Sequence, residues 1–407
     1  MSRICRNTKT NRELLMEDTI DKILKSMSKI KKHHRIFITI LLCTLMFFRG
    51  KATFRNMSRY CGINEKRFSR WYRREFDFTV FNCKLLAYES KEKEYIAAID
   101  ASFMEKSGKK TEGLGKFYNG KTGRSEYGLE MSLVSIIDMT ANTAYALDAR
   151  QTLNDTDKTK TDCYVQQVKR LKAPLNDLDI KYLVCDAYYT KEKFIRPVTE
   201  QGLHIVGKLR IDADAWWPYQ GKYKGKGRPK RYDGKVNFSK DTKRFEYVGK
   251  MDQEIEVYTT IVWLKMIKQK IRIVLLKFKD KHVLLYSTDT ALGANKIISY
   301  YKARYQIEFV FRDAKQHTGL THCQSRSKKA IHTQINASLT ALNLIKLQDK
   351  WKKNTDKKTV ISIASWKRRK LNQHLMKTLF QELDLDMKDQ KVMDVYKPFS
   401  NYGTIAA

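Results

Sequence analysis

Three acidic residues, far apart in the sequence, have the chemistry and placement expected of metal ligands or general bases. Asp100 and Asp186 each follow a short run rich in apolar residues, at 95–99 and 181–185. Such runs are typical of buried strands, and ligands of α/β sheets bind at the carboxyl ends of strands. Glu308 follows in a stretch with helical periodicity. All three acids are therefore candidate functional residues.

The helix predicted from about Asn295 to Lys315 carries a polar stripe. At about 100° per residue, Arg304, Glu308 and Lys315 lie within roughly 60° of Tyr301. An Arg and a Glu four residues apart also stabilise ordinary solvated helices, so the stripe alone leaves that simpler explanation open. The order of the three acids along the chain, and the elements that carry them, favour a shared site.

Three carboxylates in one place would concentrate enough negative charge to hold two Mg²⁺ ions. Two such ions activate an attacking oxygen and stabilise the leaving oxygen in phosphodiester chemistry. Arg304 and Lys315 would then contact phosphates beside the scissile bond.

A spaced pattern, Tyr-x2-Arg-x3-Glu-x6-Lys, is met without a gap by Tyr301, Arg304, Glu308 and Lys315. It resembles the YREK signature of bacterial DDE transposases of the IS-four group of insertion sequences. The segments AIDAS around Asp100 and VCDAYYT around Asp186 are similar to that family's first two catalytic motifs. The resemblance covers roughly residues 95–318.

The resemblance implies an α/β fold with a ribonuclease-H-like catalytic core and the activity of a DDE transposase, a polynucleotidyl transferase that cuts and joins DNA. It implies that Asp100, Asp186 and Glu308 are the catalytic residues and the ligands of two Mg²⁺ ions, for which Mn²⁺ can substitute. It further implies that Tyr301, Arg304 and Lys315 hold the transposon end. The expected partners are double-stranded DNA, as transposon ends and target, and a second copy of the chain in the synaptic complex.

Some members of that family pass through a DNA hairpin and stack a flipped base on a Trp just upstream of the YREK helix. The strand predicted there, His282–Tyr286, has no Trp. Trp263, Trp216 or Trp217 could serve instead, although a buried Trp is the commoner case. The hairpin step is left open.

The elements around these motifs predict three regions. Residues 1–90 have helical spacing, and residues 91–320 read as strands and helices in the order β-β-β-α-β-α-β before a mainly β insertion at about 210–287. Residues 321–407 are again helical. In that last region the apolar periodicity fits either core packing or a dimer contact.

The N-terminal region contains helix-turn-helix spacing between residues 54 and 71. A Gly at position 62 precedes Asn64, which is a plausible N-cap of the second helix. That helix carries Lys66, Arg67 and Arg70, which we expect to bind DNA. A basic helical hairpin packed against a neighbouring domain is the alternative.

The insertion holds a Gly-rich basic segment, residues 221–231, in which Arg228, Lys230 and Arg231 surround a Pro. Its Gly-Arg-Pro core resembles an AT-hook, and flexible backbone with dense positive charge suits a narrow minor groove. A solvated basic loop is the alternative.

The composition supports a nucleic-acid partner. The 407 residues include 80 Lys and Arg against 44 Asp and Glu, a formal net charge of +36, which disfavours an ordinary metabolic enzyme. Seven Cys without a CxxC pair fit a reducing cytoplasm, and we expect association with the bacterial nucleoid. The apolar run Ile36–Phe48 is too short for a membrane span, and the Lys-Lys-Thr at 109–111 lacks the upstream Gly of an ATP-binding loop.

The sequence thus predicts a DNA transposase that binds the terminal inverted repeats of its element and catalyses metal-dependent strand cleavage and strand transfer. Two rivals stay open. One is a ribonuclease-H-like nuclease that cleaves without joining strands, and the other is a catalytically idle basic DNA-binding protein.

Overall fold

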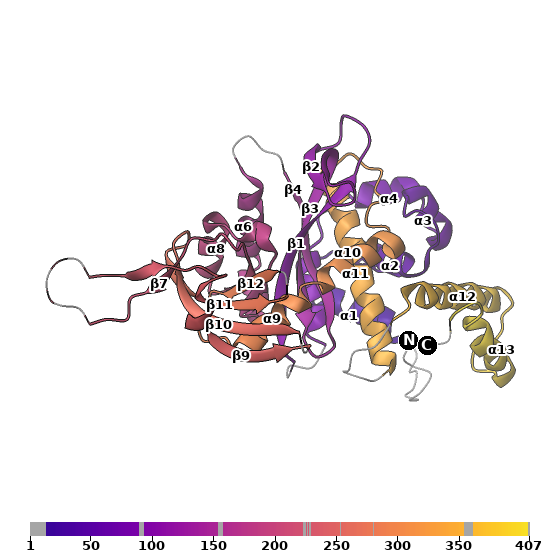
Figure 1. The fold of residues 1–407 in the computed structure, drawn as a ribbon. Helices are drawn as coiled ribbons and strands as arrows, with labels where there is room; N and C mark the ends of the chain where they lie inside the picture. The colour runs from indigo at the N-terminus through magenta and orange to yellow at the C-terminus, as the bar shows by residue number, and fades with distance from the viewer. Residues whose placement is uncertain are drawn as a thin grey trace.

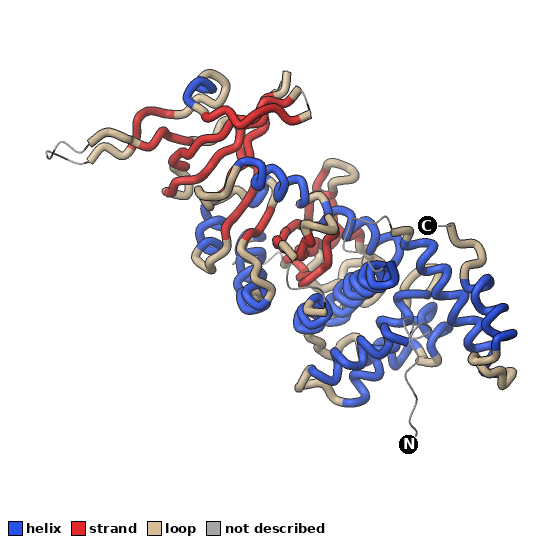
Figure 2. Tube along the Cα trace, turned by 90° about the horizontal axis from the view of Figure 1, so that it is seen from below, coloured by secondary structure: helices blue, strands red, loops and turns tan. Residues whose placement is uncertain are grey.

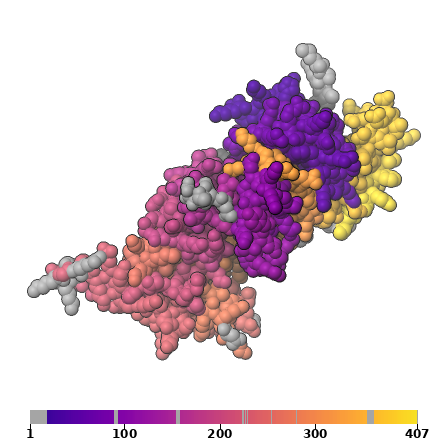
Figure 3. Space-filling model, turned by 90° about the horizontal axis from the view of Figure 1, so that it is seen from above, coloured from indigo at the N-terminus to yellow at the C-terminus, as the bar shows by residue number. Residues whose placement is uncertain are grey.

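The computed structural model describes residues 14–88, 93–153, 158–222, 225, 227, 229–252, 254–279, 281–353 and 361–405. Strands gather in one half of the molecule and most helices in the other (Figure 2). The N-terminal helices (indigo) and the C-terminal helices (yellow) share the helical end (Figure 3).

The N-terminal region is helical, as the sequence predicted. Its helices are α1 (Leu14–Ser26), α2 (Lys32–Phe47), α3 (Phe54–Cys61), α4 (Glu65–Trp71) and α5 (Phe78–Leu86). The apolar run of the sequence forms α2, which buries Phe37, Leu41 and Leu45 on one face. The ring of Phe37 on α2 stacks on the ring of Trp71 on α4 with centroids 5.5 Å apart, so the two helices pack against each other.

Helices α3 and α4 form the turn between helices that the sequence indicated (Figure 1). Gly62 ends α3 with φ of +64°, a left-handed conformation that favours glycine. The Asn64 side chain then accepts a hydrogen bond from the backbone N–H of Arg67 and caps α4. Phe68 is fully buried on the inner face of α4, which leaves its basic residues on the outer side.

One mixed sheet of twelve strands crosses the molecule. The strands are β1 (Tyr95–Glu105), β2 (Gly115–Asn119), β3 (Arg124–Asp138), β4 (Thr143–Thr152), β5 (Tyr182–Val184), β6 (His204–Leu209), β7 (Ala215–Pro218), β8 (Tyr232–Lys235), β9 (Glu246–Met251), β10 (Ile255–Leu264), β11 (Gln269–Lys277) and β12 (His282–Ser287). Their order is β2-β3-β1-β5-β6-β12-β11-β10-β7-β8, with β4 also beside β3 and β9 beside β10. The pairs β1–β5 and β5–β6 are parallel.

The predicted β insertion is not a separate sheet. Strand β12 pairs antiparallel with β6, and β11, β10, β7 and β8 continue outward from it. The structure also has four strands before α6 where the sequence predicted three, and the additional strand is β2. Alternate residues of β2 are buried, with Phe117 at its centre fully covered.

Helices cover both faces of the central strands. On one face lie α6 (Lys160–Arg170), α7 (Lys172–Asp177) and α8 (Glu192–Thr199), and on the other α9 (Ala294–Ala303) and α10 (Gln306–Asp313), while α11 (Lys328–Lys353) contacts β4 (Figure 1). Tyr164 of α6 donates a hydrogen bond to Glu130 of β3. Asp100 of β1 meets Arg304, just before α10, on the opposite face.

Helix α11 protects the outer edge of β4. Its residues from Ala330 to Lys350 are almost all buried. Two of its Asn side chains form the backbone hydrogen bonds with β4 that a neighbouring strand would otherwise form. Asn343 accepts from Ala146 N–H at 2.8 Å and donates to Ala146 C=O at 2.7 Å. Asn336 makes the same two bonds with Ala149, each at 3.0 Å. These amides satisfy backbone groups that an edge strand would otherwise leave unpaired.

Two expectations about the site-bearing elements were wrong. Asp100 does not end a strand, because β1 continues to Glu105 in full register with β3. The long helix predicted from 295 to 315 is interrupted: α9 ends at Ala303, α10 starts at Gln306, and Ala314–Thr318 forms a π-helical turn. The backbone N–H groups of 304 and 305 donate to carbonyls of residues 300–302, and the carbonyls of 304 and 305 accept from the N–H groups of 307 and 308, so α9 does not continue evenly into α10.

The C-terminal region is helical, with α12 (Ile363–Glu382) and α13 (Gln390–Ser400) packed together. Leu375 and Leu379 of α12 and Leu383, its C-cap, are each more than half exposed. Among the helices that the structure describes, none is long and apolar enough to cross a membrane.

Candidate active site

Asp100 lies on the inner part of the sheet with little exposure. Its carboxylate accepts a hydrogen bond of 2.8 Å from the N–H of Ala101, and its side chain is 20% exposed. Burial raises the pKa of Asp100 to about 6, and the charges of Asp186 and Glu308 add to that rise, while Arg304 opposes it. The three acids therefore act on one another electrostatically.

Strand pairing places Asp186 beside Asp100. Ala98 of β1 is in parallel register with Val184 of β5, so two residues farther along each chain Asp100 and Asp186 reach the same level of the sheet. Asp186 follows the end of β5 and caps a short 3₁₀ turn by accepting from Tyr188 N–H at 2.9 Å. The expectation that Asp186 sits just past the carboxyl end of a strand holds.

Arg304 joins two of the three acids. Its guanidinium lies 3.6 Å from Asp100 Oδ2 and 2.7 Å from Glu308 Oε1, and its side chain is only 15% exposed. Burial lowers the pKa of Arg304, but the two carboxylates outweigh that effect and raise it. The pairing is thus more than a solvated contact along one helix, because it ties α10 to a central strand.

The π-helical turn after α10 positions Lys315. Its ammonium group donates to Ser102 Oγ at 2.8 Å and to Phe103 C=O at 3.4 Å, both on β1. Burial lowers the pKa of Lys315, and Lys121 adds to the effect. Ser102 and Asp100 share a face of β1 because side chains alternate along a strand, so Lys315 lies next to the acidic cluster.

Tyr301, one turn before Arg304, is half-buried behind these groups. Burial raises the pKa of its hydroxyl, and the positive charge of Arg304 opposes the rise. Tyr301, Arg304 and Glu308 thus lie close to the two aspartates, and Lys315 contacts β1 two and three residues beyond Asp100, even though the helix that carries them is broken.

Within the part of the chain that the structure describes, no three His, Cys, Asp or Glu side chains are close enough together to hold a metal ion. The donors around Arg304 are nevertheless of the right kind, because Mg²⁺ prefers carboxylate oxygens. The guanidinium marks a position at which Asp100 and Glu308 already bind a cation. The residues fit a divalent ion in chemistry and charge, and they would close around one only after Arg304 moves aside.

The predicted DNA-binding residues lie at two other places. Lys66 and Arg70 are exposed on α4, and Arg67 beside them is half-buried. Lys230 and Arg231 are exposed just before β8, at the end of the sheet farthest from the helical regions, and Lys230 pairs with Asp233 at 3.2 Å. Arg228 lies outside the described residues.

The tryptophans considered for a flipped base pack within the β7–β10 part of the sheet. Trp216 and Trp263 are directly paired across β7 and β10, and Trp217 is 6% exposed against Phe245. Three strands, β6, β12 and β11, separate them from β5 and Asp186.

The sequence reasoning missed Ser102 as a partner of Lys315. The signal was present, because Ser102 is two residues from Asp100 in a strand and must share its face. It was overlooked because the predicted strand ended at Asp100.

A family model described as "Transposase DDE domain" matches residues 91–344 of this chain. The chain belongs to that family. The matched range begins just before β1, includes all three acids and ends within α11. A search of curated proteins gives no match. The family assignment establishes a transposase-type domain, and the roles of individual residues rest on the geometry above.

Proposed function

We propose that the chain is a DNA transposase of the YREK-bearing IS-four group, with a ribonuclease-H-like catalytic core. The observation that carries the proposal is the convergence of Asp100, Glu308 and Arg304, which come from segments about 200 residues apart in the chain. Strand register adds Asp186 beside Asp100. The DDE family of the domain supports the same reaction class.

In this proposal Asp100, Asp186 and Glu308 hold two Mg²⁺ ions, for which Mn²⁺ can substitute. When bound, the ions supply an activated attacking oxygen and stabilise the leaving oxygen. Arg304, released from its two carboxylates, and Lys315, beside them on β1, would hold phosphates next to the scissile bond, because both are cations. Tyr301 would support Arg304 from the preceding turn.

DNA binding is assigned to surfaces away from the acids. The outer face of α4, with Lys66, Arg67 and Arg70, would enter a groove of the terminal inverted repeat. The basic segment before β8, with Lys230 and Arg231, would contact the backbone or minor groove. Two copies of the chain would hold the two ends in the synaptic complex.

The test uses a linear DNA that carries the gene with its native flanks. Purified protein is incubated with it in Mg²⁺ or in EDTA, and nicks are mapped on a denaturing gel. We expect Mg²⁺-dependent cuts at the edges of flanking inverted repeats, lost in Glu308→Gln while end binding persists. Glu192→Gln, which alters a half-buried Glu paired with Arg196 on α8, is the matched control.

Three outcomes separate the rivals. Normal cleavage by Glu308→Gln would overturn the site assignment. Cleavage without joining of the 3′ end to a second DNA would favour a non-transposing nuclease. Tight binding without any cut in Mg²⁺ or Mn²⁺ would favour an idle DNA-binding protein.

A further inference from the structure

The hairpin formed by β2 and β3 carries an exposed surface that none of the roles proposed above uses. In this hairpin Lys116 lies opposite Tyr127, and Tyr118 lies opposite Ser125. Directly opposed side chains lie on the same side of a sheet, so these four residues share one face, which we call the hairpin face. Lys116 and Ser125 are exposed, and Tyr118 and Tyr127 are 61% and 66% exposed.

The hairpin face continues the face of the sheet that carries Asp100. Asp100 lies directly opposite Leu133 in the ladder between β1 and β3, and Tyr127 precedes Leu133 on β3 by an even number of residues. Because side chains alternate along a strand, all three point to the same side. Ser102, which binds Lys315, lies on β1 between the levels of Asp100 and Tyr127. A DNA strand that runs from the acidic cluster along β1 therefore meets the hairpin face.

The turn of the hairpin is within electrostatic reach of Lys315. Burial lowers the pKa of Lys315, and the positive charge of Lys121, which lies in that turn, adds to the effect. The hairpin is also anchored from its other side. Phe117 is fully buried there, with the ammonium group of Lys160 on α6 4.4 Å from its ring centroid. The hairpin face is thus presented on a fixed support beside the candidate active site.

The rings and cations of the hairpin have no partners within the described chain. Neither Tyr118 nor Tyr127 makes a ring contact, a cation–π contact or a side-chain hydrogen bond there. The hairpin has three exposed cations, which form no ion pair with a described acid: Lys116, Lys121 and Arg124. Its one acid, Glu126, accepts from Asn119 Nδ2 and Thr122 Oγ1, each at 2.7 Å, and so fixes the turn.

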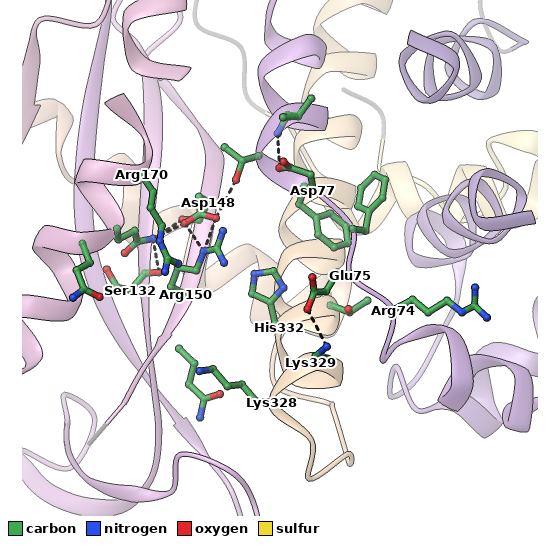
Figure 4. A pocket seen from close by; sticks show the side chains of 18 of the residues that line it. Arg74, Glu75, Asp77, Ser132, Asp148, Arg150, Arg170, Lys328, Lys329 and His332 are labelled. Carbon is green, nitrogen blue, oxygen red and sulfur yellow. Dashed lines mark hydrogen bonds and ion pairs between the residues drawn. The ribbon is translucent and has the colours of Figure 1, made fainter. Parts of the chain in front are cut away.

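The opposite side of the sheet has a different character. A cavity of about 910 Å³ lies beside β4, with Ser132 in its lining (Figure 4). Ser132 is next to Leu133 on β3 and therefore points away from the side of Asp100. The acid Asp148 in that lining already pairs with Arg150 at 3.0 Å. The cavity is separate from the hairpin face, and a strand held at the acidic cluster stays on the other side.

We propose that the hairpin face binds an unpaired stretch of DNA strand next to the acidic cluster. The two tyrosines stack on its bases, and the three cations contact its phosphates. Exposed rings among unpaired cations are the chemistry of single-strand binding, because every base has a flat face, whereas a duplex keeps its bases stacked inside. Diagonal side chains on paired strands are about 7–8 Å apart, roughly twice the 3.4 Å rise per nucleotide, so a base fits between the two rings.

The place of this strand rests on the proposed function, but its binding is tested without catalysis. Anisotropy of a labelled probe is measured with the purified full chain in EDTA at about 0.15 M salt, where distant exposed charges are screened. The probes are a short single-stranded oligonucleotide, the same backbone with abasic sites in place of its bases, and the blunt duplex.

The double variant Tyr118→Ala/Tyr127→Ala removes both rings, and Tyr118→Phe/Tyr127→Phe keeps them. Tyr247→Ala is the matched control, because Tyr247 is a 53% exposed tyrosine on β9 of the same sheet. We expect the Ala double variant to weaken binding of the single strand at least about tenfold. The Phe double variant and Tyr247→Ala should change it by no more than about twofold. The abasic and duplex probes should bind all four proteins alike.

The phosphate contacts are tested by the salt dependence of single-strand binding. If Lys116 meets one phosphate, Lys116→Ala should lower the slope of log K against log salt by about 0.7. Lys181→Ala, which removes an exposed Lys before β5, should leave the slope unchanged. Because the net charge is +36, these differences between variants are the measurement that counts, not binding itself.

Three results would overturn the inference. The first is single-strand binding that the Ala double variant leaves unchanged. The second is an equal loss on the abasic probe, which would mean that the rings do not stack on bases. The third is an equal loss on the duplex, which would make the hairpin face a duplex-binding surface. Failure of the natural protein to cleave in Mg²⁺ would refute the proposed function instead and would leave these binding results standing.

Discussion

The centre of the candidate active site is a cation held between carboxylates. Arg304 contacts both Asp100 and Glu308 and is itself largely buried, so it neutralises charge that would otherwise be unfavourable at the sheet. A divalent ion bound by the same carboxylates must compete with that guanidinium. Metal binding and the position of Arg304 are therefore coupled.

Replacing Arg304 with Ala should strengthen Mg²⁺ binding, because Asp100 and Glu308 lose their competing partner. Without DNA present, the rise in melting temperature caused by Mg²⁺ over EDTA should be larger in Arg304→Ala than in the natural protein. A tenfold gain in affinity would correspond to about 1.4 kcal/mol of added stabilisation. Arg312→Ala, which removes an Arg of α10 paired with Asp313, should respond to Mg²⁺ as the natural protein does. An equal Mg²⁺ effect in all three proteins would refute the competition.

A second prediction concerns the proposed contact between the ammonium group of Lys315 and a phosphate of the transposon end. If its ammonium group meets one phosphate of the transposon end, Lys315→Ala should weaken end binding and lower the slope of log K against log salt by about one unit. Lys181→Ala removes an exposed Lys that precedes β5, at the other end of that strand from Asp186, and should leave the slope unchanged. Titration of labelled end DNA at several salt concentrations measures both. A slope that Lys315→Ala leaves unchanged would mean that Lys315 does not contact a phosphate of the transposon end.

At the scale of elements, the local sequence pattern predicted which strands and helices carry the three acids, but not where those strands and helices begin and end. The apolar run before Asp100 ends where burial becomes partial, whereas β1 continues because β3 pairs with it residue by residue to Glu105. The segments on either side of the break after Ala303 pack on different strands, α9 on β6, β11 and β12 and α10 on β1 and β4, which helical periodicity cannot reveal. The side chains of Arg304 and Glu308, which the sequence placed on one stripe, still meet across the break, at 2.7 Å.

The edge of β4 offers a test of how α11 holds the sheet. Asn343→Ala should remove both partners of the Ala146 backbone and leave a buried N–H and C=O unpaired, at a loss of about 2–4 kcal/mol. Asn295→Ala, on an exposed position of α9, should change stability by no more than about 0.5 kcal/mol. Urea unfolding midpoints compare the two. A loss as small for Asn343 as for Asn295 would mean that another group, such as water, satisfies the strand.

At the scale of the whole molecule, the sequence predicted a mixed α/β chain with helical ends but not a single sheet. Strand β12 returns to β6 across some 75 residues, and nothing in either segment specifies that pairing. The cavity beside β4 was equally hidden, since its lining comes from both terminal halves of the chain. Long-range contacts of this kind decide the architecture, whereas local residue patterns decide which elements exist.

Lys367 of α12 ties three distant parts of the molecule together and makes stability depend on pH. Its ammonium group donates to Leu45 C=O of α2 at 3.1 Å and to His317 C=O of the π-helical turn at 2.5 Å. Burial lowers the pKa of Lys367 to about 7, and Arg49 adds to that effect. In the unfolded chain the pKa of a Lys is about 10.4. Between these values the unfolded chain binds the extra proton, so stability should rise with pH from about 7 upward, by at most about 1.4 kcal/mol per unit.

Lys367→Met keeps the apolar stem and removes the charge, so the rise in melting temperature between pH 7 and 9 should be smaller than in the natural protein. Burial also lowers the pKa of Lys346, to about 8, and that residue contributes a rise of the same sign in both proteins. The difference between the two curves therefore isolates Lys367. Lys377→Met, at an exposed position of the same helix, should follow the natural curve. If Lys367→Met instead shows the full rise, the ammonium group is not the titrating link between the C-terminal helices and the turn that carries Lys315.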